Sequence, residues 1–137
     1  MSPATLTSTG VILLTVVAVA YGGTYLLRVT TGRVPANELQ RSWFRAGHAH
    51  AAVLIILGLL VRLYVEQPGV PGWSSGLASG ILIAAILMPA GFFLSVTGRD
   101  PQRPNRLRVL IWLGAASLVV GLVAAGAGLI VAGQSAA

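Results

Sequence analysis

The chain has no cysteine and very little charge. Without thiols it can form neither disulfide bonds nor thiolate metal sites. Charged residues make up 9% of the 137 residues, whereas a soluble domain of this size carries about 25%. Hydrophobic residues make up 55%. This composition excludes an ordinary soluble domain and favours a membrane protein.

Acidic side chains are scarce, and every basic side chain is an arginine. Glu38, Glu66 and Asp100 are the only acidic residues, and the formal net charge is +6. Eight of the nine arginines form two clusters beside apolar runs, so the charge indicates orientation in a membrane rather than binding of nucleic acid. The clusters are Arg28, Arg33, Arg41 and Arg45, and then Arg99, Arg103, Arg106 and Arg108.

Four apolar runs are each long enough to cross a bilayer, which takes about 20 residues. They cover residues 10–29, 44–65, 73–97 and 107–132. Together they fill most of the chain and predict a single domain, residues 1–137, an all-α membrane protein built as a bundle of four transmembrane helices. The first run is not preceded by positive charge and continues through Leu27, so we expect a membrane helix there rather than a signal peptide.

The connections between the runs predict the topology. The positive-inside rule places both arginine-rich loops in the cytoplasm and both termini outside, for a multi-pass protein of the cell membrane. Turn-forming residues occupy 31–35, 67–72 and 98–105. The polar residues 36–42 are expected to form an interfacial segment before the second span, and Asn105 is placed to cap the fourth helix.

Small residues recur along the last three runs at helical spacing. They include Gly114, Gly121 and Gly128, which are seven residues apart. In lipid, small residues let helices approach closely, because packing rather than hydrophobicity drives their association. These residues can serve packing within one chain, but their number leads us to expect a homo-oligomer in the lipid bilayer.

Both histidines lie near the start of the second run, within residues 43–50. Ionisable groups inside a span are costly, and a ligand or an ion usually explains them. Each residue of a helix turns by about 100°, so His48 and His50 point about 200° apart and cannot chelate one metal ion from a single helix. With no thiol and few carboxylates elsewhere, a closed metal site is poorly supplied.

A haem site needs fewer protein ligands than a closed metal site. It requires one imidazole for the iron, an apolar slot for the macrocycle and cations for the propionates. Either histidine can supply the iron ligand. Gly47 and Ala51 are small and leave room on the helix surface. Arg41, Arg45 and the second arginine cluster lie where the propionates would emerge. The alternative is a histidine that bonds a neighbouring helix, and residue chemistry leaves both open. Tyr25 lies at a depth from which it could reach a cofactor near the cytoplasmic side.

Two segments resemble the styrene oxide isomerase family. Trp43 to Leu54 is similar to the family's helix that carries an Arg-Ala-His segment after an aromatic residue, and Gly91 to Ser95 is similar to its Gly-Phe-Tyr segment. Members of this family are small four-helix membrane proteins that form trimers, bind haem b through that histidine and isomerise aryl epoxides to aldehydes. The resemblance implies a haem b site in this chain, with Phe93 beside it, and a trimer.

The chain departs from the family at the polar residues. The family's catalytic tyrosine falls at Phe93, its aspartate at Ala85 and, with His48 aligned as the ligand, its asparagine at Leu54. The resemblance therefore implies a shared scaffold and a shared haem site, and it does not carry over the isomerase activity.

We therefore expect a haem-b-binding membrane protein that senses a haem ligand or performs Lewis-acid chemistry on a small apolar molecule. Two alternatives remain. One is a small channel or transporter subunit that uses the histidine pair for protons or cations, and the other is a structural subunit of a larger membrane complex. No pair of broken helices and no inverted repeat is evident, which argues against transport.

Overall fold

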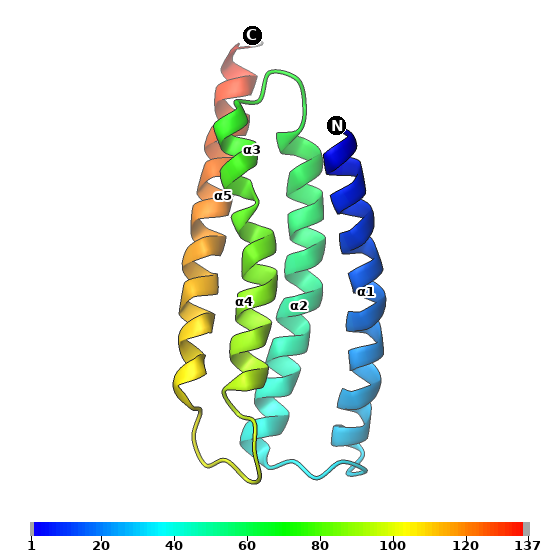
Figure 1. Ribbon diagram of the computed structural model, residues 1–137. Helices are drawn as coiled ribbons and strands as arrows, with labels where there is room; N and C mark the ends of the chain where they lie inside the picture. Colours follow the sequence, from blue (N-terminus) through cyan, green and yellow to red (C-terminus); the bar gives the residue numbers. More distant parts are fainter. Residues whose placement is uncertain (1, 136–137) are drawn as a thin grey trace.

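The computed structural model describes residues 2–135, and within them it contains helices and no strands. The elements are α1 (Pro3–Thr30), α2 (Glu38–Val65), α3 (Gly72–Ala78), α4 (Gly80–Leu94), a 3₁₀ turn (Arg106–Arg108) and α5 (Val109–Ser135). Figure 1 shows them as four roughly parallel columns, with α3 stacked on α4. All four columns are long and apolar enough to cross a membrane. The predicted all-α bundle of four spanning helices is confirmed.

The first two helices begin earlier than the hydropathy predicts, because their starts are capped. The Ser2 hydroxyl accepts a hydrogen bond from the Thr5 N–H at 3.1 Å, so α1 begins at Pro3. Asn37 and Gln40 form a capping box, in which each side chain accepts a bond from the other residue's N–H. Residues 38–42 are therefore the first turns of α2, and not a separate interfacial segment.

The third span contains an interruption that the sequence analysis did not predict. α3 ends and α4 begins at Ser79, whose hydroxyl donates to the Gly76 carbonyl at 2.6 Å. From α5, the Ser117 hydroxyl donates to the Gly80 carbonyl at 2.9 Å. Because hydroxyls bond carbonyls on both sides of the break, an interrupted helix can be accommodated inside an apolar bundle.

The start of the fourth span matches the prediction. The Asn105 side chain accepts a hydrogen bond from the Leu107 N–H at 2.8 Å and so caps the 3₁₀ turn that leads into α5. Asn105 also fastens this loop to the end of α4, because its backbone N–H donates to the Ser95 carbonyl and its side-chain Nδ2 donates to the Leu94 carbonyl.

Glycines let α5 lie directly on α3 and α4. A Cβ atom added at Gly121 would lie 2.9 Å from Ile81 Cγ1, and one at Gly114 would lie 2.5 Å from Met88 Cγ. Gly128 is packed against α3 in the same way. The glycine repeat that suggested an oligomer is thus used for packing within one chain, and it no longer argues for association between chains.

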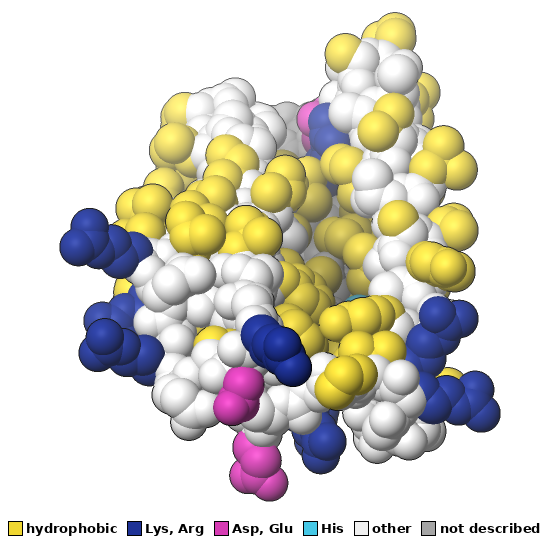
Figure 2. Space-filling view, turned by 60° about the horizontal axis from the view of Figure 1, so that its bottom comes forward, with side chains coloured by type: hydrophobic (Ala, Val, Ile, Leu, Met, Phe, Trp, Pro, Cys, Tyr) yellow, Lys and Arg dark blue, Asp and Glu magenta, His cyan; other side chains and the backbone are white. Residues whose placement is uncertain are grey.

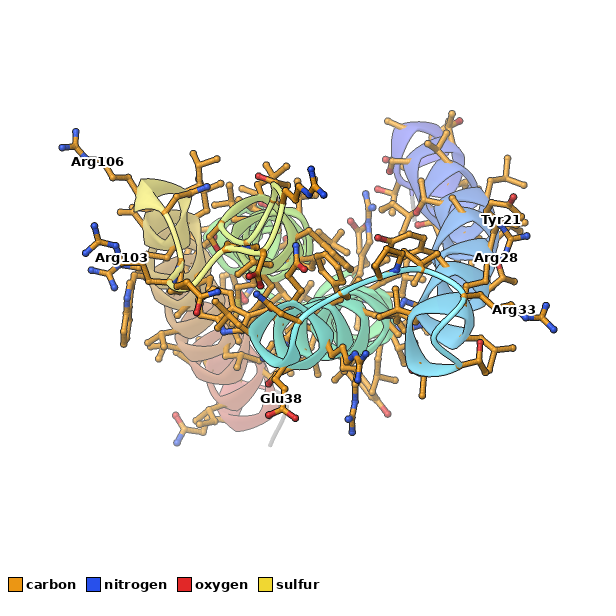
Figure 3. The ribbon with its side chains drawn as sticks, turned by 90° about the horizontal axis from the view of Figure 1, so that it is seen from below. Tyr21, Arg28, Arg33, Glu38, Arg103 and Arg106 are labelled. Carbon is orange, nitrogen blue, oxygen red and sulfur yellow. The ribbon has the colours of Figure 1, made fainter. Side chains whose placement is uncertain are left out.

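Helix α1 stands to one side of the other three columns, as Figure 3 shows from below. It packs mainly against α2. At the end that carries the loops 31–37 and 95–105, called here the arginine-rich end, Val29 is buried with Phe44 and Val96. At the opposite end, the Thr5 hydroxyl donates to the Glu66 carboxylate at 3.2 Å. These contacts fix both ends of α1.

The contact between α5 and α4 gives a stability prediction. Replacing Gly121 by alanine should lower the free energy of unfolding by about 1–3 kcal/mol, because the methyl group would overlap Ile81 and its backbone. Gly126→Ala is the matched control on the same helix, since nothing lies within 4 Å of its added Cβ. Unfolding in detergent by increasing dodecyl sulfate measures both variants. Equal stability of the two would contradict this packing.

Candidate functional site

The two histidines lie on different faces of α2, as helix geometry predicts. His48 lies against α1, where a Cβ atom added at Gly23 would be 3.5 Å from its Nε2 atom. His50 lies against α4, with its ring centroid 5.0 Å from that of Phe92. The pair therefore does not form one chelating site, and each ring has its own surroundings.

A groove of about 410 Å³ lies beside His48 between α1 and α2. We call it the His48 groove. Its lining is apolar or small apart from the imidazole and one phenol. The residues are Ala18, Val19, Gly22, Tyr25, His48, Ala51 and Phe93. Figure 2 looks toward this region from the arginine-rich end, and histidine shows only as a small patch in a hollow among hydrophobic side chains.

The ring of His48 is half-buried and makes no hydrogen bond within residues 2–135. His50 differs, because its Nδ1 atom hydrogen-bonds the Ala46 carbonyl at 2.8 Å. This bond leaves the Nε2 atom of His50 as the nitrogen available to a ligand. Both imidazoles can thus donate to a metal, but His48 is the one that lines a groove.

An aromatic row forms the wall of the His48 groove toward the arginine-rich end. The rings of Tyr25 and Phe44 meet edge to face at 6.0 Å, and those of Phe44 and Phe93 stack at 5.7 Å. Gly47 lies beneath this row, where an added Cβ would be 3.0 Å from Phe93 Cε2. The space that Gly47 leaves is therefore filled by phenylalanine, so Gly47 positions Phe93 and does not itself open the groove.

Two of the predicted cations share the helical stripe of His48. Arg45 and Arg41 precede it by three and seven residues, which places them about 5 and 10 Å nearer the arginine-rich end on the same side of α2. Both side chains are exposed. An anionic group that entered the His48 groove from this end would meet them.

The contribution of α1 to this site was not predicted from the sequence. Gly22 and Gly23 lie against the His48 ring, and larger side chains there would occupy its space. The signal was a glycine pair inside the first apolar run, which is unfavourable for a helix unless something approaches closely. Tyr25, whose depth had been noted, lines the same groove.

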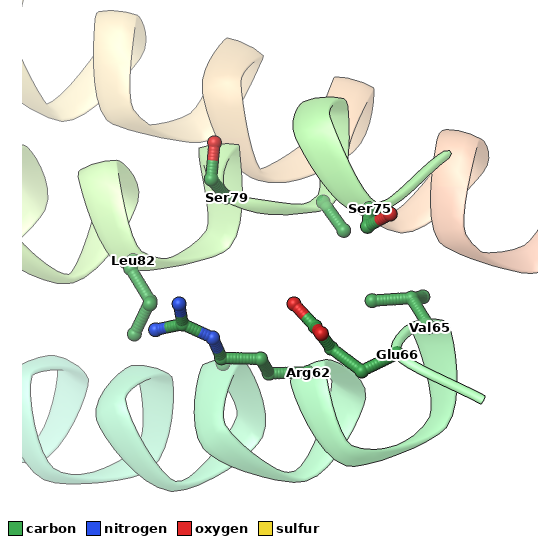
Figure 4. Close-up of a pocket in the computed structure, with 8 residues that line it drawn as sticks. Arg62, Val65, Glu66, Ser75, Ser79 and Leu82 are labelled. Carbon is green, nitrogen blue, oxygen red and sulfur yellow. The ribbon is translucent and has the colours of Figure 1, made fainter. Parts of the chain in front are cut away.

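A second, smaller pocket lies at the other end of α2, beside the interruption at Ser79. It holds about 100 Å³ and is lined by Arg62, Glu66, Ser75 and Ser79 among apolar neighbours. Figure 4 shows the guanidinium and the carboxylate lying along the same side of the pocket. Since the Glu66 carboxylate accepts the bond from Thr5, this pocket also helps to hold α1 on α2.

Comparisons with protein-family models, with curated proteins and with solved structures find no match for this chain. The resemblance to the styrene oxide isomerase family thus stays a prediction that depends on the two short segments named above.

Proposed function

We propose that this protein is an integral membrane protein that binds haem b, with His48 as the axial ligand of the iron. The observation that carries the proposal is a half-buried imidazole, without a hydrogen bond within residues 2–135, that lines an apolar groove. A polar ring left without a partner in such a place is costly unless a ligand satisfies it.

The residues present fit the requirements of a haem. The His48 groove has a volume within the range of cofactor pockets, which is about 300–1,000 Å³, and its lining is mostly apolar. Phe93 and Ala51 would face the porphyrin. Arg41 and Arg45 would pair with the propionates, because they lie on the same stripe toward the membrane surface.

His50 is the alternative ligand, and one observation favours it. Histidines that bind metals usually donate their other ring N–H to a carbonyl or carboxylate, which fixes the ring and its tautomer. The bond between His50 Nδ1 and the Ala46 carbonyl is of this kind. The packing of His50 on Phe92 equally suits a purely structural ring, so the two histidines must be separated by mutation.

The bound haem would supply a Lewis-acidic iron that binds a small apolar molecule or a diatomic gas. Around it, Tyr25 is the only residue with a hydroxyl among those that line the His48 groove. Phe93 cannot donate a proton, and Ala85 and Leu54 are buried apolar residues. With so few groups to move protons, the site is better suited to binding and sensing a ligand than to acid–base catalysis.

Replacing His48 should abolish haem binding. In His48→Ala the Soret band of the haem-supplemented protein should be lost while helical content is kept, because α2 is apolar enough without the ring. His50→Ala tests the alternative ligand on the same helix and should only shift or weaken the band. Arg45→Gln should reduce haem affinity less than either, since a propionate near the surface can find water or Arg41.

The optical spectrum can also overturn the proposal. A Soret band that survives His48→Ala but not His50→Ala would assign the iron to His50. A band that survives the double replacement would exclude both ligands. A native protein that shows no Soret band after haem supplementation would favour a channel, a transporter subunit or a structural subunit instead.

The orientation in the membrane is a further part of the proposal. Both arginine clusters lie in or beside the loops 31–37 and 95–105, and Figure 1 shows these loops at the end of the bundle opposite the start of α1 and the end of α5. Reporter fusions after Gln102 and after Ala137 should therefore report the cytoplasm and the outside, respectively. The same compartment for both fusions would contradict four crossings.

We also propose a homo-oligomer, with a trimer favoured by the resemblance alone. The glycine repeat no longer supports it, because α3, α4 and α5 use those residues within the chain. Mass measurement of the protein released from nanodiscs should give a multiple of 14.1 kDa. A monomer at all protein concentrations would remove this part of the proposal.

A further inference from the structure

A second groove lies on the side of the bundle where α4 meets α5. Its inner part has a volume of about 640 Å³ and is lined mainly by aromatic and aliphatic side chains. Its outer part is lined by three arginines, with Pro104 and Asn105 between them. Pro104, Arg106 and Arg108 line both parts, so the two form one continuous surface, called here the interfacial groove.

The outer part carries positive charge that nothing in its lining balances. Arg103, Arg106 and Arg108 line it, and no acidic residue does. Figure 3 shows Arg103 and Arg106 projecting from this corner, away from the bundle. The nearest carboxylate in sequence, Asp100, is instead bound by the Asn37 side chain at 2.9 Å.

The end of the helix adds to this positive charge. The arginines lie at the N-terminal end of the fourth span, whose first turn holds no acidic residue. The helix dipole puts partial positive charge at this end, so cations here are unfavourable without an anion nearby. The hydrogen bonds of Asn105 fix the loop to the end of α4, so the backbone that carries the arginines is held in place.

Apart from Arg106 and Arg108, the inner part is lined by apolar side chains, and it extends from the loop along the start of α5. Trp43 packs edge to face on Phe92 at 5.4 Å, and Trp112 is 74% exposed beside them. Trp112 follows Arg108 by four residues, which places it about 6 Å further along the same helical face. The polar headgroup layer of a bilayer is about 5–8 Å thick on each side. The spacing of Arg108 and Trp112 therefore suits one side chain at the outer boundary of this layer and the other at its inner boundary.

We propose that the interfacial groove binds one anionic phospholipid of the surrounding bilayer. The phosphate lies among the three arginines, which donate charge-assisted hydrogen bonds to its oxygens. An acyl chain lies along the aromatic inner part. The arginines complement the charge of such a lipid, and the lining of the groove changes from polar to apolar along its length. A soluble anion would contact only the arginines and would leave the apolar inner part unused. The groove lies on the α4–α5 side and is separate from the His48 groove.

Quenching of tryptophan by brominated lipids tests the proposal. The protein with Trp43→Phe and Trp73→Phe keeps Trp112 as its one tryptophan and is reconstituted in vesicles of phosphatidylcholine and phosphatidylglycerol. Either lipid is brominated in turn. Trp112 should be quenched preferentially by the anionic lipid, with a relative binding constant on the order of tenfold. Equal quenching by both lipids would overturn the proposal.

Matched variants distinguish lipid binding in the interfacial groove from attraction of anionic lipid by the total positive charge of this end. Arg103→Gln, Arg106→Gln and Arg108→Gln together should abolish the preference. Arg28→Gln, Arg33→Gln and Arg99→Gln together remove the same charge from the same end of the bundle but lie outside the groove lining, and they should keep it. Equal loss in both triple variants would show that only the general field attracts anionic lipid, and would contradict a site.

Two further measurements keep the test decisive. If the first triple variant fails to fold by circular dichroism, Arg108→Gln alone should still reduce the preference several-fold, and an unchanged preference would count against the groove. Added inorganic phosphate should not relieve quenching by the anionic lipid. Relief at millimolar phosphate would identify the arginines as a site for free phosphate and would overturn the lipid as occupant.

Discussion

The close contact of α5 with α3 and α4 organises the whole bundle. In lipid, helices associate mainly by packing, and glycines set how near two backbones can come. Gly114, Gly121 and Gly128 face α3 and α4, and Gly58 and Gly47 let α2 approach α4. These contacts join three columns into one compact unit. α1 is left with α2 as its principal neighbour, and the space beside it becomes the His48 groove.

The two histidines take different surroundings because α2 lies between α1 and α4. The face of α2 toward α4 carries His50, whose ring is bonded to a backbone carbonyl and packed on Phe92. The face toward α1 carries His48, and the glycines of α1 leave its ring room without giving it a hydrogen-bond partner. A ligand for His48 would complete an interface that the chain leaves apolar and partly open.

The number and placement of the spans could be predicted from hydropathy, because each apolar run is long and continuous. The residues at which the helices start could not be predicted from hydropathy. Ser2 and the Asn37–Gln40 pair extend α1 and α2 through capping hydrogen bonds, which a hydropathy profile does not contain. The break at Ser79 depends on Ser117 of a distant helix. The divergence of the histidines followed from helix geometry alone. The surroundings of the two rings could not be predicted in this way, because the role of Gly22 and Gly23 appears only when α1 is placed against α2.

The position of the iron is the most direct test of haem ligation by His48. Crystals of the haem-loaded protein, measured at the iron absorption edge, would give an anomalous peak that locates the metal without reference to sequence. We predict one peak per chain within bonding distance of the His48 ring, between α1 and α2. A peak beside His50 on the α4 side, or a well-ordered chain with no iron in the His48 groove, would contradict it.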